Sequence, residues 1–211
     1  MNTTESPAGA KTIEIAGDFS RLPLPPHALA NLQRLGYTSM TPIQAASLPL
    51  ALAGHDLIAQ AKTGSGKTAA FALVLLSNLK RDDQSGAPQV QALVLCPTRE
   101  LAEQVTQEIR RLARTEENIK TLTLCGGSAL RPQQQSLEHG AHIVVGTPGR
   151  ILDHLQRGSL SLAALNTLVL DEADRMLDMG FFDDIAAVAK QAPKARQTLL
   201  FSATYPEGIA K

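Results

Sequence analysis

The segment Ala61–Thr68 (AKTGSGKT) has the residue types and spacing of a phosphate-binding loop, although alanine replaces the usual first glycine. It follows an apolar run and precedes a helix-like segment, Ala69–Leu79, as such a loop requires. Glycines let backbone N–H groups turn toward phosphate oxygens at a helix start. We expect Lys67 to reach the β- and γ-phosphates and Thr68 to ligate Mg²⁺. A Gly/Ser turn before a helix is the simpler alternative. The expected phosphate-binding residues are Thr63, Gly64, Ser65, Gly66, Lys67 and Thr68.

A second chemical signal is Asp171-Glu172-Ala173-Asp174, which comes directly after the apolar run Thr167–Leu170. A carboxylate at the end of a buried strand is costly unless it meets a cation. We therefore expect Asp171 to hold Mg²⁺, usually through water. Glu172 is placed to orient and deprotonate an attacking water, which makes Glu172 and Lys67 the catalytic candidates. Alone, these acids could be a solvated helix start, an alternative that the upstream phosphate loop disfavours.

Short apolar runs that alternate with helix-period segments must position these residues. In Glu100–Arg114, for example, apolar residues recur on one helical face. Such alternation predicts an α/β fold with a central parallel sheet and helices on both faces. Ligands of such sheets bind at the carboxyl ends of the strands. The expected strands are Asp56–Ala61, Gln91–Cys96, Ile119–Cys125, His142–Val145, Thr167–Leu170 and Gln197–Ser202.

Composition limits the classes of function. The 211 residues, 44% hydrophobic and 19% charged, are enough for one globular domain, and no apolar stretch could cross a bilayer. Zero net charge and a lack of tryptophan argue against a basic coat or a base-stacking platform. Any RNA should therefore be held by its backbone. Cys96 and Cys125 show no zinc pattern and are expected to be buried thiols in a reducing cytoplasm.

Taken together, the motifs resemble those of the DEAD-box RNA helicases from Phe19 to the end of the chain. The sequence around the motifs is most similar to a bacterial branch of that family that acts in ribosome assembly. Seven motifs in order are far more specific than one. They are GYTSMTPIQ at Gly36–Gln44, AKTGSGKT, PTRELA at Pro97–Ala102, Gly126-Gly127, TPGR at Thr147–Arg150, DEAD, and SAT at Ser202–Thr204.

The resemblance implies an adenine site. Phe19 lies 17 residues before Gly36, where the family has an aromatic that stacks on adenine. Gln44 matches the glutamine of the family's Q motif, and an amide offers the donor and acceptor that adenine's N7 and N6 need. Without the family, Phe19 would be an ordinary core aromatic and Gln44 a surface helix residue.

The resemblance also implies contacts with the RNA backbone and a link between the two ligands. Ser202 and Thr204 match a coupling motif that hydrogen-bonds toward Asp174. For individual residues, helix caps and salt bridges are the alternative roles. The residues that match RNA contacts are Thr98, Arg99, Gly126, Gly127, Thr147, Gly149 and Arg150.

As domains, we expect a flexible tail over residues 1–17 and a RecA-like P-loop domain over residues 18–211. The family's second RecA-like domain, which supplies arginine fingers in cis, and a C-terminal RNA-binding domain have no counterpart here, so we expect a fragment. It should be a cytoplasmic monomer that binds ATP, Mg²⁺ and RNA but hydrolyses ATP poorly. The implied role of the full-length protein is RNA unwinding in assembly of the large ribosomal subunit.

Two rival classes and one closer variant remain open from the sequence. A P-loop kinase or GTPase shares the phosphate loop, but the guanine-recognition motif NKxD is not found. A non-enzymatic RNA-binding domain would have no need of Glu172 beside Asp171. A DNA translocase is a closer variant, against which the adenine motif, TPGR and DEAD argue.

Overall fold

A single parallel sheet forms the centre of the computed structural model, which describes residues 17–81 and 86–204. Within these residues the strand order is β1-β6-β5-β2-β4-β3, and every pairing is parallel. The predicted fold class is therefore confirmed. The tail predicted over residues 1–17 lies almost wholly outside the described residues. The strands are β1 (Leu57–Gln60), β2 (Ala92–Leu95), β3 (Thr121–Leu124), β4 (Ile143–Gly146), β5 (Thr167–Leu170) and β6 (Gln197–Ser202).

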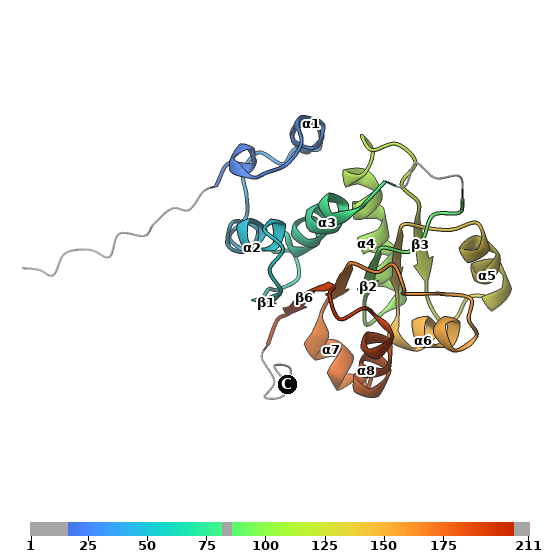
Figure 1. The fold of residues 1–211 in the computed structure, drawn as a ribbon. Coiled ribbons are helices and arrows are strands. Elements are labelled where there is room, and N and C mark those ends of the chain that lie inside the picture. The colour runs from blue at the N-terminus through green and yellow to red at the C-terminus, as the bar shows by residue number, and fades with distance from the viewer. Residues whose placement is uncertain (1–16, 82–85, 205–211) are drawn as a thin grey trace, which may run out of the picture.

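Helices cover both faces of the sheet (Figure 1). The first four pack on one face and the last four on the other, and each layer has its own apolar cluster. No helix among the described residues is long and apolar enough to cross a bilayer. The helices are α1 (Pro26–Arg34), α2 (Pro42–Leu52), α3 (Lys67–Asn78), α4 (Arg99–Leu112), α5 (Leu130–Glu138), α6 (Pro148–Gln156), α7 (Ala173–Asp178) and α8 (Phe182–Gln191), after a short 3₁₀ turn at Phe19–Arg21.

Burial on both faces explains why the strands are continuous apolar runs. In β2 every residue is buried. Ala92 and Val94 pack with the α1–α4 layer, whereas Leu93 and Leu95 pack with the α5–α8 layer, as alternation along a strand requires. All six predicted strands are present, with ends that differ by at most two residues from those expected.

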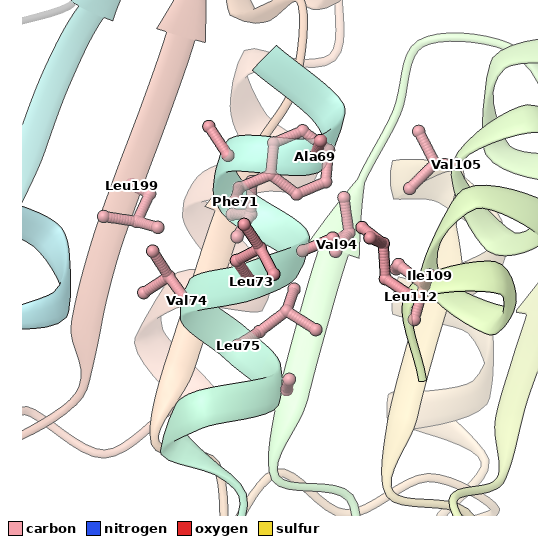
Figure 2. Packing of buried hydrophobic residues seen from close by; sticks show 14 of the residues in the cluster. Ala69, Phe71, Leu73, Val74, Leu75, Val94, Val105, Ile109, Leu112 and Leu199 are labelled. Carbon is pink, nitrogen blue, oxygen red and sulfur yellow. The ribbon is translucent and has the colours of Figure 1, made fainter. Parts of the chain in front are cut away.

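Helix α3 is the centre of the first layer (Figure 2). Residues from Ala69 to Leu75 are buried, and the Phe71 ring lies 5.5 Å from the Phe201 ring of β6. The helix begins at Lys67, two residues earlier than predicted, because the left-handed Gly66 ends the phosphate loop and starts the helix. Helix α4 begins one residue earlier than predicted, where the Thr98 hydroxyl accepts a hydrogen bond from the Leu101 N–H.

The last residue of β4, Gly146, permits a close approach that sets the position of the following loop. A Cβ at Gly146 would lie 2.4 Å from the backbone oxygen of Leu124 on β3 and 2.7 Å from Cδ1 of Ile151. The backbone oxygen of Leu124 cannot move aside as the end of a flexible side chain could. Glycine is therefore required for β3 and β4 to end side by side.

We expect Gly146→Ala to lower the free energy of unfolding by about 1–3 kcal/mol, the usual cost of overpacking a tight interior. Urea denaturation measures the difference. Gly126→Ala is the matched control, because a Cβ there would meet nothing within 4 Å. Equal unfolding midpoints for Gly146→Ala and the unsubstituted chain would show that this position tolerates a Cβ.

Candidate functional site

The sequence motifs come together along one edge of the sheet, because every parallel strand ends there. The phosphate loop follows β1, Thr204 follows β6 and Asp171 follows β5. Since β1, β6 and β5 are neighbours in the sheet, these segments form one group. The segments that begin at Thr98, Gly126 and Thr147 follow β2, β3 and β4, the neighbouring strands in the other half. The edge is thus divided into two halves.

Two glycines give the phosphate loop its shape. Gly64 and Gly66 have φ values of +79° and +86°, the left-handed region that favours glycine. A Cβ at Gly66 would also lie 2.6 Å from Nε2 of Gln44. Residues 62–64 of the loop are exposed, and the loop leads into the N-terminus of α3, where unpaired N–H groups favour an anion. Thr68, in the first turn of α3, is half-buried.

Lys67 joins the phosphate loop to the DEAD segment. Its Nζ lies 2.8 Å from Oδ1 of Asp171 and 3.5 Å from Oε1 of Glu172. The side chains of Lys67 and Asp171 are 5% and 0% exposed. A lysine and two carboxylates from separate motifs therefore share one buried site.

Asp171 is a fully buried carboxylate that forms an ion pair with Lys67. Burial raises the pKa of its carboxyl above the ordinary value, although Lys67 opposes that shift and Glu172 adds to it. Apart from the ion pair with Lys67, neither carboxylate oxygen has a hydrogen-bond partner among the described residues. A buried carboxylate of this kind suits a divalent cation, for which oxygen ligands are the usual choice.

Glu172 has an unusual backbone and weak contacts. Its φ of +53° is left-handed, which is rare for a residue other than glycine. Its side chain accepts long hydrogen bonds of 3.4 Å from the Thr63 hydroxyl and from Arg175. The turn therefore directs Glu172 toward the phosphate loop while leaving its carboxylate loosely held.

The two adenine-site candidates lie in different surroundings. Gln44 is 1% exposed, so the alternative of a surface helix residue is wrong. Its Oε1 accepts from the Thr41 N–H at 2.9 Å, and its Nε2 donates to the Gly66 carbonyl at 3.0 Å. Phe19 is 4% exposed and meets the Tyr37 ring edge-on at 6.2 Å. Phe19 is thus part of the core here, and its role in stacking on adenine stays a prediction.

Asp174 connects the DEAD segment to the end of β6. Its Oδ2 accepts hydrogen bonds from the Thr204 N–H and hydroxyl at 3.1 and 2.9 Å, and its N–H donates to Oγ of Ser202 at 3.2 Å. Burial acts to raise the pKa of Asp174, but these hydrogen bonds hold it below the ordinary value. The expected hydrogen bonds are present, whereas their coupling role stays a prediction.

In the other half of the edge, the predicted RNA contacts from β2 and β3 are close together. Arg99 is exposed and forms an ion pair with Glu103 at 3.0 Å. Gly126 and Gly127 are exposed, and a Cβ on Gly127 would lie 3.9 Å from the Arg99 guanidinium. Thr98 caps α4, which is the alternative role considered for it, and that contact leaves a nucleic-acid role untested.

The segment after β4 completes this half. The Thr147 hydroxyl accepts from the Gly126 N–H at 3.4 Å, and Gly149 is exposed in the first turn of α6. Arg150 is half-buried and donates from Nη1 to the Ser128 carbonyl and to Oε1 of Gln133, both at 3.0 Å. The seven predicted RNA contacts therefore lie on three neighbouring strand ends.

Gln133 and His154 were missed by the sequence analysis. Both are linked to Arg150, yet nothing distinguishes Gln133 from its neighbours Gln134 and Gln135 in the sequence. The prediction for the two cysteines is confirmed: Cys96 and Cys125 are buried free thiols. Burial raises the pKa of the Cys96 thiol well above its ordinary value, so it is no nucleophile.

Comparisons with known proteins agree with this arrangement. A family model described as DEAD/DEAH box helicase matches residues 41–211. The chain belongs to this family. The matched range of this DEAD-box chain includes the phosphate loop, the acidic motif and all the RNA candidates, but it leaves out Phe19.

Individual DEAD-box relatives are similar over most of the chain. It is 64% identical over 187 residues to the ATP-dependent RNA helicase DbpA of Escherichia coli (strain K12), covering 89% of this chain and 40% of that protein. It is 47% identical over 193 residues to the DEAD-box ATP-dependent RNA helicase CshA of Streptococcus pneumoniae serotype 4 (strain ATCC BAA-334 / TIGR4), covering 92% and 36%. The chain thus spans two fifths or less of these relatives.

A solved structure supports the same assignment. The crystal structure of a DEAD box protein from the hyperthermophile Methanococcus jannaschii superposes with a TM-score of 0.85 and 42% sequence identity. The match covers 92% of this chain and 52% of that one. The fold of this chain is therefore that of a DEAD-box domain.

Lys67→Met should make stability depend on pH, because it leaves Asp171 buried without its cation. We expect a loss of about 3 kcal/mol in the free energy of unfolding at neutral pH. A carboxyl whose pKa is raised in the folded chain stabilises it at low pH and ceases to do so as pH rises through that pKa. The loss should therefore be small near pH ~4 and grow toward pH ~8.

Urea denaturation across that pH range, without nucleotide or divalent cations, tests the expectation. Lys62→Met is the matched control, since Lys62 is an exposed lysine of the same loop. A deficit in Lys67→Met that stays constant with pH would show that Asp171 is not the group that responds.

Proposed function

We propose that this chain is the ATP-binding core domain of an RNA-dependent ATPase that separates short RNA duplexes, acting in the cytoplasm during assembly of the large ribosomal subunit. The observation that carries the proposal is the meeting of Lys67, Asp171 and Glu172 at the phosphate loop. A phosphate-binding cation, a metal-binding carboxylate and a base are the groups that hydrolysis of a nucleoside triphosphate needs. The names of the relatives, all ATP-dependent RNA helicases, support the same activity.

The phosphates of ATP would lie against the backbone of Thr63–Thr68 and the start of α3. Lys67 would turn from Asp171 toward the β- and γ-phosphates. Asp171 and the Thr68 hydroxyl are the residues suited to Mg²⁺, which would neutralise charge that develops on the phosphates. The assignment is supported by the Asp171 oxygens, which among the described residues have no polar partner besides Lys67.

Glu172 would accept the proton of the attacking water. Its carboxylate is close to Lys67 and is held only by long hydrogen bonds, so it can reorient toward a water molecule. If Glu172 served only as a negative charge at the start of α7, it would need no contact with the phosphate loop. The bond from Thr63 therefore favours the catalytic role.

The half of the edge beyond β2 would bind the RNA backbone. Exposed glycines permit a phosphate to approach the main chain closely, and Arg99 and Arg150 can pair with phosphates. Backbone binding implies little preference for base sequence and discrimination of RNA from DNA through the 2′-hydroxyl. A second RecA-like domain in cis would close over both ligands, and the chain alone would be a monomer.

Gln44 supports adenine as the base. Each of its amide atoms uses one hydrogen bond within the protein, and each has capacity for a second. The remaining positions match the N6 donor and the N7 acceptor of adenine, with Phe19 as the proposed stacking partner. Guanine, which carries a carbonyl in place of the amino group, would oppose an acceptor to the Gln44 oxygen.

We therefore expect the chain to bind ADP more tightly than GDP, and Gln44→Ala to lose that preference. Because Nε2 also holds the Gly66 carbonyl, the variant should bind both nucleotides more weakly. Isothermal titration calorimetry measures the four affinities. Equal affinities for ADP and GDP in the unsubstituted chain would refute the adenine site.

The 211-residue chain should bind ATP with Mg²⁺ but hydrolyse it slowly, with little stimulation by RNA and no release of a short duplex. Fast hydrolysis would need an arginine from a facing second domain, a contribution worth roughly 10³–10⁵ in rate. Joining a second RecA-like domain should restore both activities. In that longer protein, Glu172→Gln should keep ATP binding and lose roughly 10²–10⁴-fold in hydrolysis.

Steady-state ATPase and duplex-release assays test these statements together. Glu138→Gln, an exposed residue on α5, is the control for removing one carboxylate. Normal hydrolysis by Glu172→Gln would mean that another group is the base. Strong RNA-stimulated turnover by the 211-residue chain alone would mean that the catalytic groups have been misplaced.

A further inference from the structure

A single glutamine side chain joins three segments of the RNA half of the edge. Nε2 of Gln133, on α5, donates to the Cys125 carbonyl at 3.1 Å, immediately before the Gly126-Gly127 pair. Its Oε1 accepts from Nη1 of Arg150 at 3.0 Å and from the His154 ring at 2.8 Å. Gln133 therefore contacts the end of β3 and the helix that follows β4 at the same time.

The partners leave the amide of Gln133 only one orientation. A carbonyl oxygen accepts only, so the group that faces Cys125 must be the NH₂. A guanidinium donates only, so the group that faces Arg150 must be the oxygen. Rotation of the amide by half a turn would oppose like groups at both contacts.

His154 holds the oxygen of Gln133 from the other side. The ring is fully buried, and its Nε2 must carry a proton because Oε1 of Gln133 can only accept. The other ring nitrogen lies 2.8 Å from Oγ of Ser159. Burial, with Arg150 next, lowers the pKa of His154, which favours the neutral ring with one donor. Both nitrogens are therefore used for hydrogen bonds within the protein.

These contacts involve one nitrogen of the Arg150 guanidinium and leave the other two available as donors. Nη1 makes both hydrogen bonds, to the Ser128 carbonyl and to Gln133, and within residues 17–81 and 86–204 neither Nη2 nor Nε makes one. A half-buried arginine fixed at one nitrogen presents its remaining donors in a set direction. Two such donors match the two oxygens of a phosphate.

We propose that Gln133 and His154 are positioning residues for the RNA backbone: Gln133 fixes the Arg150 guanidinium relative to the Gly126–Ser128 loop, and His154 fixes Gln133. The inference rests on the proposed function, since it requires RNA at this edge. It adds two residues that do not touch RNA and a physical reason why two separated motifs act as one surface.

The three consecutive glutamines provide a matched test. Gln133→Met removes the amide at similar volume, and Gln135→Met makes the same change at an exposed position of the same helix. We expect Gln133→Met to weaken binding of a short oligouridylate by about tenfold, the equivalent of one hydrogen bond to a charged group. ADP affinity should not change in either variant, and Gln135→Met should bind RNA normally.

A second pair of variants tests His154 by rescue. His154→Gln can still donate to Gln133 from a similar position, whereas His154→Phe cannot. We expect His154→Phe to weaken RNA binding and His154→Gln to recover most of it, with equal ADP affinity. This pair also decides the matter if Gln133→Met loses ADP binding and so fails to fold.

NMR titration of the chain with the oligouridylate reads binding at Gly126 and Gly127 and follows the Nε–H signal of Arg150 directly. In Gln133→Met that signal should shift before RNA is added. Arg150→Ala distinguishes RNA binding at this edge from the positioning role of Gln133 and His154. If Arg150→Ala binds RNA normally, or if the unsubstituted chain binds no RNA, the proposed function of this edge is wrong. If Arg150→Ala weakens binding while Gln133→Met and His154→Phe do not, only the positioning proposal is overturned.

Discussion

The common direction of the strands is the constraint on which the rest of the structure depends. Parallel strands end on one edge of their sheet, so segments that are distant in sequence must meet there. The phosphate loop after β1 and the acidic motif after β5 are separated by more than a hundred residues but share an ion pair through Lys67. No single loop could place a lysine and two carboxylates in this way.

The strand order then divides that edge into two halves, each with one group of candidate residues. The three strands β1, β6 and β5 are followed by the phosphate loop, Thr204 and the acidic residues, whereas β2, β4 and β3 are followed by the exposed glycines and by Arg99 and Arg150. Asp174 and Thr204 bond within the first half, and Gln133 and Arg150 bond within the second. Each half therefore has its own internal hydrogen bonds, and the shared sheet sets the distance between the two.

The sequence predicted the fold and the position of most site residues because both depend on local patterns. Apolar runs between turn residues locate the strands, and the residues directly after them must lie at the ligand-binding edge. Contacts between side chains far apart in the chain are different. Phe19 is packed against Tyr37, and Gln133 is selected from three adjacent glutamines only by the positions of Cys125, Arg150 and His154. No pattern along the chain encodes those distances.

The ion pair between Lys67 and Asp171 would make ligand binding at the proposed site an exchange of partners. The ammonium group of Lys67, which a phosphate would need, already pairs with the fully buried carboxylate of Asp171. In the proposed reaction, a nucleotide that takes Lys67 would leave the buried charge of Asp171 without a partner, and a divalent cation would restore the balance. Under the proposed function each ligand would therefore remove an obstacle to the other, so their affinities would be linked, and by reciprocity the coupling would be the same whichever binds first.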